Sequence, residues 1–464
     1  MSNTKRELNL YSFYDHTGIA RHLEKMAAEG WLLERISTGS GIWRYRKAEP
    51  QTLRYAVTYF PAASDFDASP GQDQQAFMDL CAEAGWQFVA QSAQMQIFCN
   101  PSADAVPLDT EPSVQVDNIH RAMKANFLIA QCLFLALALL NFAVLAFSFH
   151  RDPLDYFTSA GMLFSTACWV LISVQAAVEL ATYFRWRSRA RAAAEEGVFL
   201  PTRGSRWLAV TVLAVLAVLV AGYLTTLEGG YVKYFLLYVA VVFACIAAGN
   251  LLKAGLKRRG TETSLNRTVT ILFAVVLTLA AVTALNYFAL SHRGFDTRDG
   301  ETVEYQWMGR AMTLERDPLP LTVADLTAFG NENYSLERHR SVSPLISQVE
   351  YLQVFRYDME PPAGQPDRLV YTVWTSRFPA LLDLAVSQCM EEAVRYVAPE
   401  ERSAYGFRET APAPWGAEEA WQYYADSVAE NVWLLRYDGR VVRIRFDWTP
   451  TAAQMSAAAE KLTA

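Results

Sequence analysis

The chain has 464 residues, 52% of them hydrophobic, and a formal net charge of −7. The charge is unevenly spread: residues 1–120 carry about −6, residues 121–290 about +8 and residues 291–464 about −9. Two acidic ends therefore flank a basic, strongly apolar middle. Acidic ends argue against a nucleic-acid-binding protein, which needs a basic face.

Residues 1–115 predict a small α+β domain made of two β-α-β-β units. The stretch MAAEGWLLE returns as LCAEAGWQF about 55 residues later, which indicates two equivalent units. We expect both units to share one sheet, with both helices on the same face. The predicted elements are strands at 8–14, 32–36, 42–46, 53–60, 87–90 and 95–99, with helices at about 15–29 and 72–84.

The start of the first helix is marked by Asp15 or Thr17, either of which can cap it. Asp15 could instead act as a general base. Apolar residues at helical spacing follow, and these predict that one helix face is buried.

A glycine followed by a tryptophan ends each predicted helix, as Gly30-Trp31 and Gly85-Trp86. Glycine adopts the positive φ of a helix end without a Cβ clash. We expect Trp31 to fold back on Met26, as in a Schellman ending. The alternative is that the tryptophans form part of a ligand cage.

The stretch FYDHTGIARHLEKMAAEGWLLERI, followed by IWRYRK, RYAVTYF, CAEAGWQF and QIF, resembles the family called domain of unknown function 2812 over residues 7–100. The Asp15/Gly18 motif and the glycine–tryptophan motifs carry the resemblance. The closing RYDGRVVRIRFDWTPTAAQM resembles the tail of longer members. The family consists of bacterial proteins that place this domain before several membrane helices, and it has no established activity. The resemblance therefore implies a regulatory or envelope-stress setting and assigns no catalytic residue.

The middle of the chain, residues 116–290, predicts a five-helix transmembrane bundle, so we expect a multi-pass α-helical membrane protein. A helix that crosses the hydrocarbon core needs about 20 apolar residues. A proline- and aspartate-containing linker over 101–117 is expected before the bundle. The five apolar runs are 126–149, 154–184, 207–227, 231–252 and 268–290.

The bias of Lys and Arg between the joints predicts the orientation of the bundle. The joints after the second and fourth helices are rich in Arg and Lys, whereas Arg151 and Lys233 are the basic residues of the other two. We therefore expect a cytoplasmic N-terminus and, after five crossings, an extracytoplasmic C-terminal domain. The arginine-rich stretch 185–191 could also attract anionic membrane lipid.

Glu179 is the only acid well inside an apolar run. Acidic residues inside membrane helices often mark a transport path. Two interpretations stay open. Glu179 could pair with a nearby cation such as Arg185, or it could form a proton or ion site.

Residues 291–464 predict a second α+β domain. Asp438-Gly439 predicts a hairpin with a type I′ turn. Thr449 is expected to cap a last helix that has Pro450 at its first position. Residues 345–357 and 368–376 are expected to be strands, residues 379–396 a helix, and residues 418–424 a short helix or strand.

No catalytic, cofactor-binding or metal-binding motif is recognised in the sequence. We therefore expect a non-enzymatic sensor or regulatory protein, with a cytoplasmic protein partner and an unidentified extracytoplasmic ligand. The alternative is a transporter or channel component with Glu179 in the path. An enzyme whose carboxylates meet only on folding is the third hypothesis.

Overall fold

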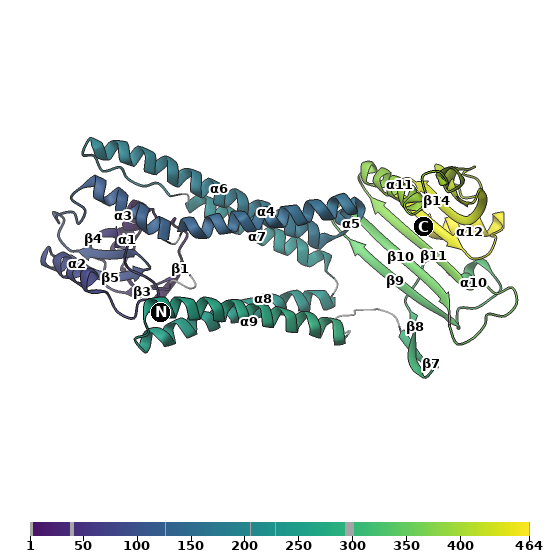
Figure 1. Cartoon of the computed structure of the whole chain (residues 1–464), viewed down its shortest axis with the longest axis horizontal. Coiled ribbons are helices and arrows are strands. Elements are labelled where there is room, and N and C mark those ends of the chain that lie inside the picture. The colour runs from purple at the N-terminus through teal and green to yellow at the C-terminus, as the bar shows by residue number, and fades with distance from the viewer. Residues whose placement is uncertain are drawn as a thin grey trace. The chain divides into compact units, whose positions relative to one another are not determined.

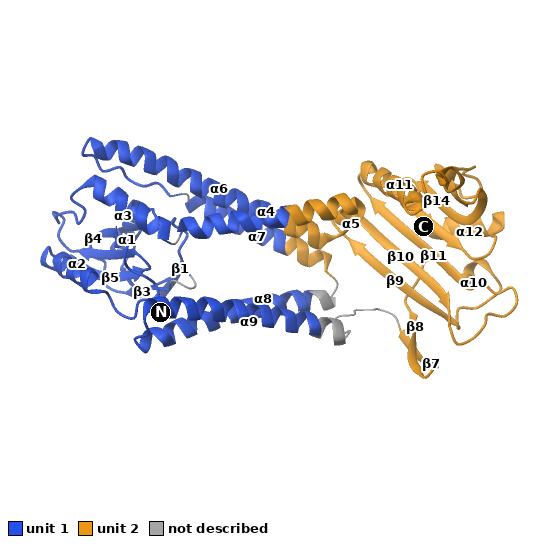
Figure 2. Cartoon of the chain, in the orientation of Figure 1, with its two compact units in different colours: residues 1–142, 167–220, 229–295 blue, residues 143–166, 221–228, 296–464 orange. Residues whose placement is uncertain are grey.

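The computed structural model describes residues 3–37, 41–125, 127–204, 206–227, 229–292 and 301–463 (Figure 1). The expected start of the first apolar run, residue 126, and residues 293–300 of the expected C-terminal domain lie outside the described residues. The chain divides into two compact units (Figure 2). Unit 1 comprises residues 1–142, 167–220 and 229–295, and unit 2 comprises 143–166, 221–228 and 296–464.

The N-terminal part of unit 1 has the predicted order of two β-α-β-β units. Its sheet arrangement differs from the prediction, because the strands form two antiparallel three-stranded sheets, β1-β3-β2 and β4-β6-β5. The elements are β1 (Thr4–Leu8), α1 (His16–Ala28), β2 (Trp31–Ser37), β3 (Ile42–Lys47), β4 (Arg54–Tyr59), α2 (Gln72–Glu83), β5 (Gln87–Ser92) and β6 (Met95–Asn100).

The two sheets meet at strands β2 and β5, which lie side by side. Both of these edge strands carry a register shift, between Leu33 and Arg35 in β2 and between Phe88 and Ala90 in β5. A bulge bends a strand and disrupts its hydrogen-bond ladder. This local bending accounts for the two separate sheets in place of the single sheet that we predicted.

The predicted strand at 8–14 is also wrong, since β1 ends at Leu8. The side chain of Asn9 accepts a hydrogen bond from the Tyr11 backbone N–H at 2.9 Å. Asn and Asp side chains that bond the backbone two residues on form turns of this kind. The chain therefore turns toward α1 where we had expected it to stay extended.

A helix, α3 (Pro112–Ala125), occupies the end of the region predicted as a linker. Proline at the first helical position suits its fixed φ. Val116, Ile119 and Met123 are buried in the core of the N-terminal part of unit 1. The sequence prediction gave too much weight to the prolines and missed this 3–4 spacing.

Within the described part of the chain, five helices are long and apolar enough to cross a membrane. They are α4 (Phe127–Arg151), α6 (Ala160–Glu195), α7 (Arg206–Thr226), α8 (Gly229–Arg258) and α9 (Thr263–His292). In their most apolar windows only 6–11% of residues are buried inside the protein. These helices therefore leave extensive apolar surface uncovered by the chain itself.

The second apolar run is not one helix from residue 154, as we had expected. A short helix, α5 (Pro153–Thr158), precedes α6. The Asp152 carboxylate caps α5 by accepting from the Asp155 N–H at 2.8 Å, and Ser159 has an extended backbone that separates the two helices.

Unit 2 contains a nine-stranded sheet in the order β12-β13-β14-β15-β11-β10-β9-β8-β7. Neighbours are antiparallel apart from β8 and β9. The strands are β7 (Glu301–Trp307), β8 (Arg310–Arg316), β9 (Tyr334–Val342), β10 (Ile346–Phe355), β11 (Arg368–Ser376), β12 (Gly406–Glu409), β13 (Glu419–Ala425), β14 (Val428–Tyr437) and β15 (Arg440–Phe446). The helices are α10 (Val323–Leu326), α11 (Pro379–Val394) and α12 (Ala452–Thr463), with a 3-10 turn at Arg402–Ala404.

The two faces of this sheet have separate cores. Val442 lies in one core together with residues of α12. The neighbouring Val441 lies in the other core together with residues of α11. Consecutive strand residues point to opposite faces. The helices α11 and α12 therefore cover opposite sides of the sheet (Figure 1).

The hairpin predicted at Asp438-Gly439 is confirmed, because β14 and β15 pair across it, but its turn type and the start of the last helix were predicted wrongly. A type I′ turn needs positive φ at both central residues. Among the described residues, this pattern occurs at Met308-Gly309 and Asp426-Ser427, whereas at the predicted turn only Gly439 has positive φ. The last helix starts at Ala452, and its cap is Thr451, whose Oγ1 accepts from the Gln454 N–H at 3.3 Å while Gln454 Oε1 accepts from the Thr451 N–H at 2.9 Å. This reciprocal capping box takes precedence over the predicted Thr449-Pro450 start.

Candidate functional site

Asp15 occupies a buried position between two glycines, and its side chain is 3% exposed. It caps α1, as expected, by accepting a hydrogen bond from the Gly18 N–H at 3.1 Å. A Cβ at Gly18 would lie 2.7 Å from Asp15 Cγ, and a Cβ at Gly204, in the α6–α7 joint, would lie 2.8 Å from it. The aspartate–glycine motif therefore needs a third residue, a glycine almost 190 positions away, to close around the carboxylate.

Thr17 does not cap α1, and it fastens the first turn of α1 to the α6–α7 joint. Its backbone N–H donates to Thr202 Oγ1 at 3.0 Å, and its own Oγ1 accepts from the Thr202 N–H at 3.1 Å. Thr202 is buried. This pair and the Asp15 contact hold the start of α1 against residues 202–204.

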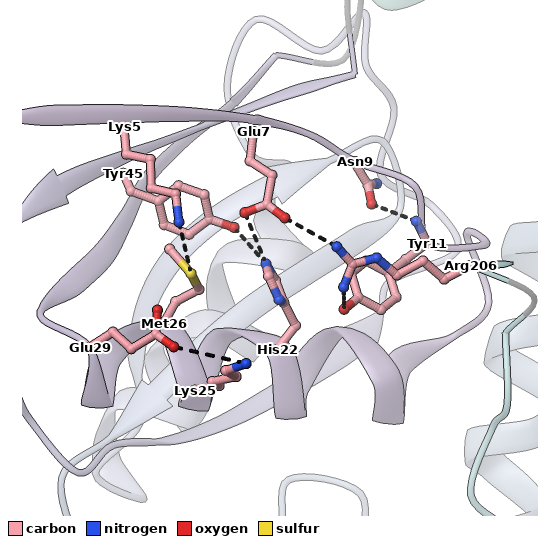
Figure 3. Close-up of polar contacts among 10 residues, drawn as sticks. All are labelled: Lys5, Glu7, Asn9, Tyr11, His22, Lys25, Met26, Glu29, Tyr45 and Arg206. Atoms are coloured by element: carbon pink, nitrogen blue, oxygen red, sulfur yellow. Dashed lines mark hydrogen bonds and ion pairs between the residues drawn. The ribbon is translucent and has the colours of Figure 1, made fainter. Parts of the chain in front are cut away.

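A polar cluster adjoins this contact and consists of Glu7, Tyr11, His22, Tyr45 and Arg206 (Figure 3). Arg206 Nη1 donates to Tyr11 Oη at 2.9 Å, and its guanidinium carbon lies 5.1 Å from the Tyr11 ring centroid. The Glu7 carboxylate lies 3.5 Å from Arg206 Nη2 and 3.4 Å from His22 Nε2. His22 Nε2 is also 3.3 Å from Tyr45 Oη. Glu7 therefore links Arg206, at the start of α7, to His22 of α1.

The polar cluster, apart from Tyr45, lines an open cavity of about 710 Å³. Burial lowers the pKa of His22, although the Glu7 carboxylate acts in the opposite direction, and Arg206 adds to the lowering. Burial likewise raises the pKa of Tyr11. At neutral pH His22 is therefore uncharged and can share its ring nitrogen between a carboxylate and a phenol.

A second contact joins the loop after β4 to the α8–α9 joint. The Asp65 carboxylate lies 3.1 Å from Lys253 Nζ, and Asn266 Nδ2 donates to the Phe66 carbonyl at 3.0 Å. The cations of Lys253 and Arg267 lie 5.6 and 5.7 Å from the Phe66 ring centroid. Sequence reasoning missed this contact, although the acidic-aromatic-acidic stretch at 65–67 complements a basic joint.

A third contact is an aromatic core between the N-terminal domain and the end of α6. The ring of Tyr14 lies 5.2 Å from that of Tyr183 and 5.6 Å from that of Trp186. His120 of α3 bonds Tyr183 Oη at 2.8 Å through Nδ1. These residues belong to the same buried cluster as Ile19 and Leu23 of α1. The domain therefore shares its hydrophobic core with a candidate membrane helix.

Comparison with known sequences identifies this region. Residues 16–131 match the family described as "Protein of unknown function (DUF2812)". This segment is a DUF2812 domain. The match starts at α1 and continues past the resemblance over 7–100, through α3 and into α4. No curated protein and no solved structure matches the chain.

The two glycine–tryptophan pairs have structural roles in the DUF2812 domain. Gly30 and Gly85 have φ values of +80° and +83°, as expected for helix ends. At the second pair both Schellman bonds form, from Trp86 N to Cys81 O at 2.9 Å and from Gly85 N to Ala82 O at 2.9 Å. Trp86 is buried and donates from Nε1 to the Val106 carbonyl.

Trp31 follows Gly30 as the first residue of β2 and pairs with Lys47. It is partly buried against the core that contains Met26.

Glu179 lies on α6, is 8% exposed, and lines a second cavity of about 420 Å³. Gln131 of α4 and Gln175 of α6 line the same cavity. The N-terminal part of unit 1 lines it through residues 8–13, Ile19, Ser92 and Met95, and α7 adds further lining residues, including Leu208 and Val212. Arg185, the cation suggested as a partner from the sequence, is exposed.

In unit 2, α11 contacts the joint between α4 and α6 through Gln388. Its Oε1 accepts from the Leu154 N–H at 3.1 Å, and its Nε2 donates to Asp152 Oδ1 at 2.7 Å. The Arg443 guanidinium lies 3.7 Å from the Glu392 carboxylate, so this arginine of the last hairpin pairs with an acid. Within the described ranges no group of three or more His, Cys, Asp or Glu side chains is placed to hold a metal.

Proposed function

We propose that this chain is a non-enzymatic membrane protein that couples an extracytoplasmic C-terminal domain to a cytoplasmic DUF2812 domain, in a sensing or regulatory role. The observation that carries the proposal is the shared core of the DUF2812 domain and α6, at Tyr14, Tyr183 and Trp186. A packed core transmits displacement because it is not freely deformable. A shift of α6 would therefore displace core side chains of the DUF2812 domain.

The proposed orientation rests on the charge of the joints. The N-terminal part of unit 1 contacts the two basic joints, through Arg206 on one and Lys253 and Arg267 on the other. The α4–α6 joint, which Gln388 contacts in unit 2, has Arg151 offset by Asp152 and Asp155. With the basic joints in the cytoplasm, five crossings put the C-terminal domain outside, and the uncovered apolar surfaces of the helices face membrane lipid.

The partners in this proposal are a cytoplasmic protein, bound by the DUF2812 domain, and an extracytoplasmic ligand, bound by the C-terminal domain. Protease access to a tag fused after Ala464, in intact protoplasts, tests the orientation. We expect the tag to be lost while the DUF2812 domain stays protected. A protected tag would contradict the two-sided arrangement.

Coupling is tested separately with Gln388→Leu in the full chain. This change removes both hydrogen bonds to the α4–α6 joint, and we expect faster hydrogen exchange at residues 199–204, where α6 leads into the DUF2812 contact. Gln454→Leu is the matched control, because Gln454 Nε2 donates to Leu326 O inside unit 2 without touching a membrane joint. Equal exchange in both variants would count against coupling.

A second candidate function is transport, with Glu179 in the path. The cavity that contains Glu179, Gln131 and Gln175 favours it, because polar groups inside a helix bundle often line such paths. Glu179→Gln should then abolish flux at unchanged expression. Unchanged flux in that variant would exclude this role for Glu179.

A further inference from the structure

We propose that the cavity at Glu179 is a binding site for a lipophilic cation, a small molecule with one positive charge on an apolar body. This inference goes beyond the proposed function, because it assigns a ligand site to the membrane end of the DUF2812 domain. It holds for either orientation of the bundle.

The size and walls of the cavity suit a small organic molecule. Its volume of about 420 Å³ lies within the roughly 300–1,000 Å³ typical of ligand pockets. One side is apolar and comes from α7, with Leu208, Val212 and Leu213. Phe13 and Phe127 add aromatic walls from the DUF2812 domain and α4. Such a surface would bury the apolar body of a ligand.

The charge of the cavity selects a cation. Among the described residues that line it, Glu179 is the one acidic or basic side chain. The Gln131 and Gln175 side chains add carbonyl oxygens, which attract positive charge or accept N–H donors. Aromatic faces also attract cations. An anion would meet the Glu179 carboxylate in a setting where charges are poorly screened.

A ligand in this cavity would contact a residue that also holds the α6–α7 joint. Tyr11 lines the cavity and accepts a hydrogen bond from Arg206 in the polar cluster. A bound ligand would therefore alter the Tyr11–Arg206 hydrogen bond, which holds the N-terminal part of unit 1 against the α6–α7 joint. Ligand binding would in this way change a contact elsewhere in unit 1.

The test measures equilibrium binding of tetraphenylphosphonium to the purified full-length protein in detergent. The permanent charge of this probe removes any dependence on its own protonation. We expect saturable binding to the wild type, at least about tenfold weaker binding to Glu179→Gln, and recovery in Glu179→Asp. Tetraphenylborate, which has the same shape and the opposite charge, should show no such dependence on Glu179.

Two further variants separate a site from a general effect. Glu195→Gln makes the same charge change at an exposed position of α6 and should bind the probe like the wild type. Val212→Trp fills the cavity while Glu179 remains, and should also weaken binding at least about tenfold. If Glu179→Gln fails to fold, this variant decides the question.

Equal affinity of the wild type, Glu179→Gln and Val212→Trp would overturn the inference, as would equally tight binding of tetraphenylborate. These measurements use neither the tag nor the Gln388 variants. A failed site would therefore leave the proposed coupling in place, and failed coupling would leave the site in place.

Discussion

The carboxylate of Asp15 lies against the α-carbon of Gly204, and these two residues stand 189 positions apart in the chain. Gly204 does not have a positive φ, so its backbone would accept any L-residue. The position needs glycine only because the Asp15 carboxylate occupies the space where a Cβ would lie. The start of α1 and the α6–α7 joint are therefore fitted to each other at atomic contact.

Gly204→Ala should destabilise unit 1 by about 1–3 kcal/mol, as overpacking of a tight contact does. The loss should shrink when Asp15 is also changed to Ala, because the two side chains would no longer collide. The measurement is thermal unfolding of the full-length protein, with the four variants compared as a double-mutant cycle. Additive losses would contradict the contact.

Gly255→Ala serves as the control for this cycle. Gly255 lies inside α8 with open space at its Cβ position. Alanine is favoured over glycine in a helix by about 1 kcal/mol, so this variant should be neutral or slightly more stable.

Acidification should weaken the DUF2812 domain. Burial lowers the pKa of His16, His22 and His120 below the ordinary value of 6.5. As pH falls through about 6.5 the unfolded chain takes up protons first, so stability is full above that pH and declines below it. Hydrogen exchange of α1 between pH 7.5 and 5.5 measures the decline.

His22→Gln should flatten this pH dependence. Glu7 favours protonation of His22, whereas Arg206 and Lys5 oppose it together with burial. Glutamine keeps a polar side chain beside Glu7 and Tyr45 but does not titrate. An unchanged slope in this variant would show that His22 does not contribute, and His339→Gln, an exposed position in unit 2, controls for loss of any histidine.

Asp65→Lys should detach the loop after β4 from the α8–α9 joint. It places a cation against Lys253, 3.1 Å from the original carboxylate. We expect hydrogen exchange of residues 61–70 to rise about tenfold, and the double variant with Lys253→Asp to restore protection in part. Asp79→Lys, at an exposed position of α2, should leave the loop unchanged.

Tyr371→Phe should destabilise unit 2 by about 1–3 kcal/mol. The buried Tyr371 hydroxyl donates to the Leu321 carbonyl at 2.9 Å and accepts from the Leu321 N–H at 3.0 Å. Its loss leaves both backbone groups without this partner. Exchange of residues 319–323 in the full chain reports the effect, and Tyr396→Phe, at a side chain that is 93% exposed, should have none.

Much of the order of the elements could be read from the sequence, because local patterns determine it, although α3 and α5 were missed. The five apolar runs, the glycine endings at Gly30 and Gly85, and the Asp15 cap each depend on residues close together in the chain. Errors arose where two local signals competed. The prolines near residue 112 led us to predict a linker where α3 begins. We predicted that the last helix starts at Thr449-Pro450, whereas the capping box at Thr451 determines its start.

The sequence by itself determined that this chain has two α+β regions around five helices long and apolar enough for a membrane, since hydrophobic length and periodicity are local properties. Only the tertiary structure decided that the DUF2812 domain forms two sheets and shares its core with α6. The same holds for the contacts of Asp15 with Gly204, Thr17 with Thr202 and Asp65 with Lys253. Each of these contacts joins residues almost 190 positions apart. Buried polar groups need partners, but no local pattern specifies which distant glycine, hydroxyl or ammonium group will lie against a given carboxylate or helix end.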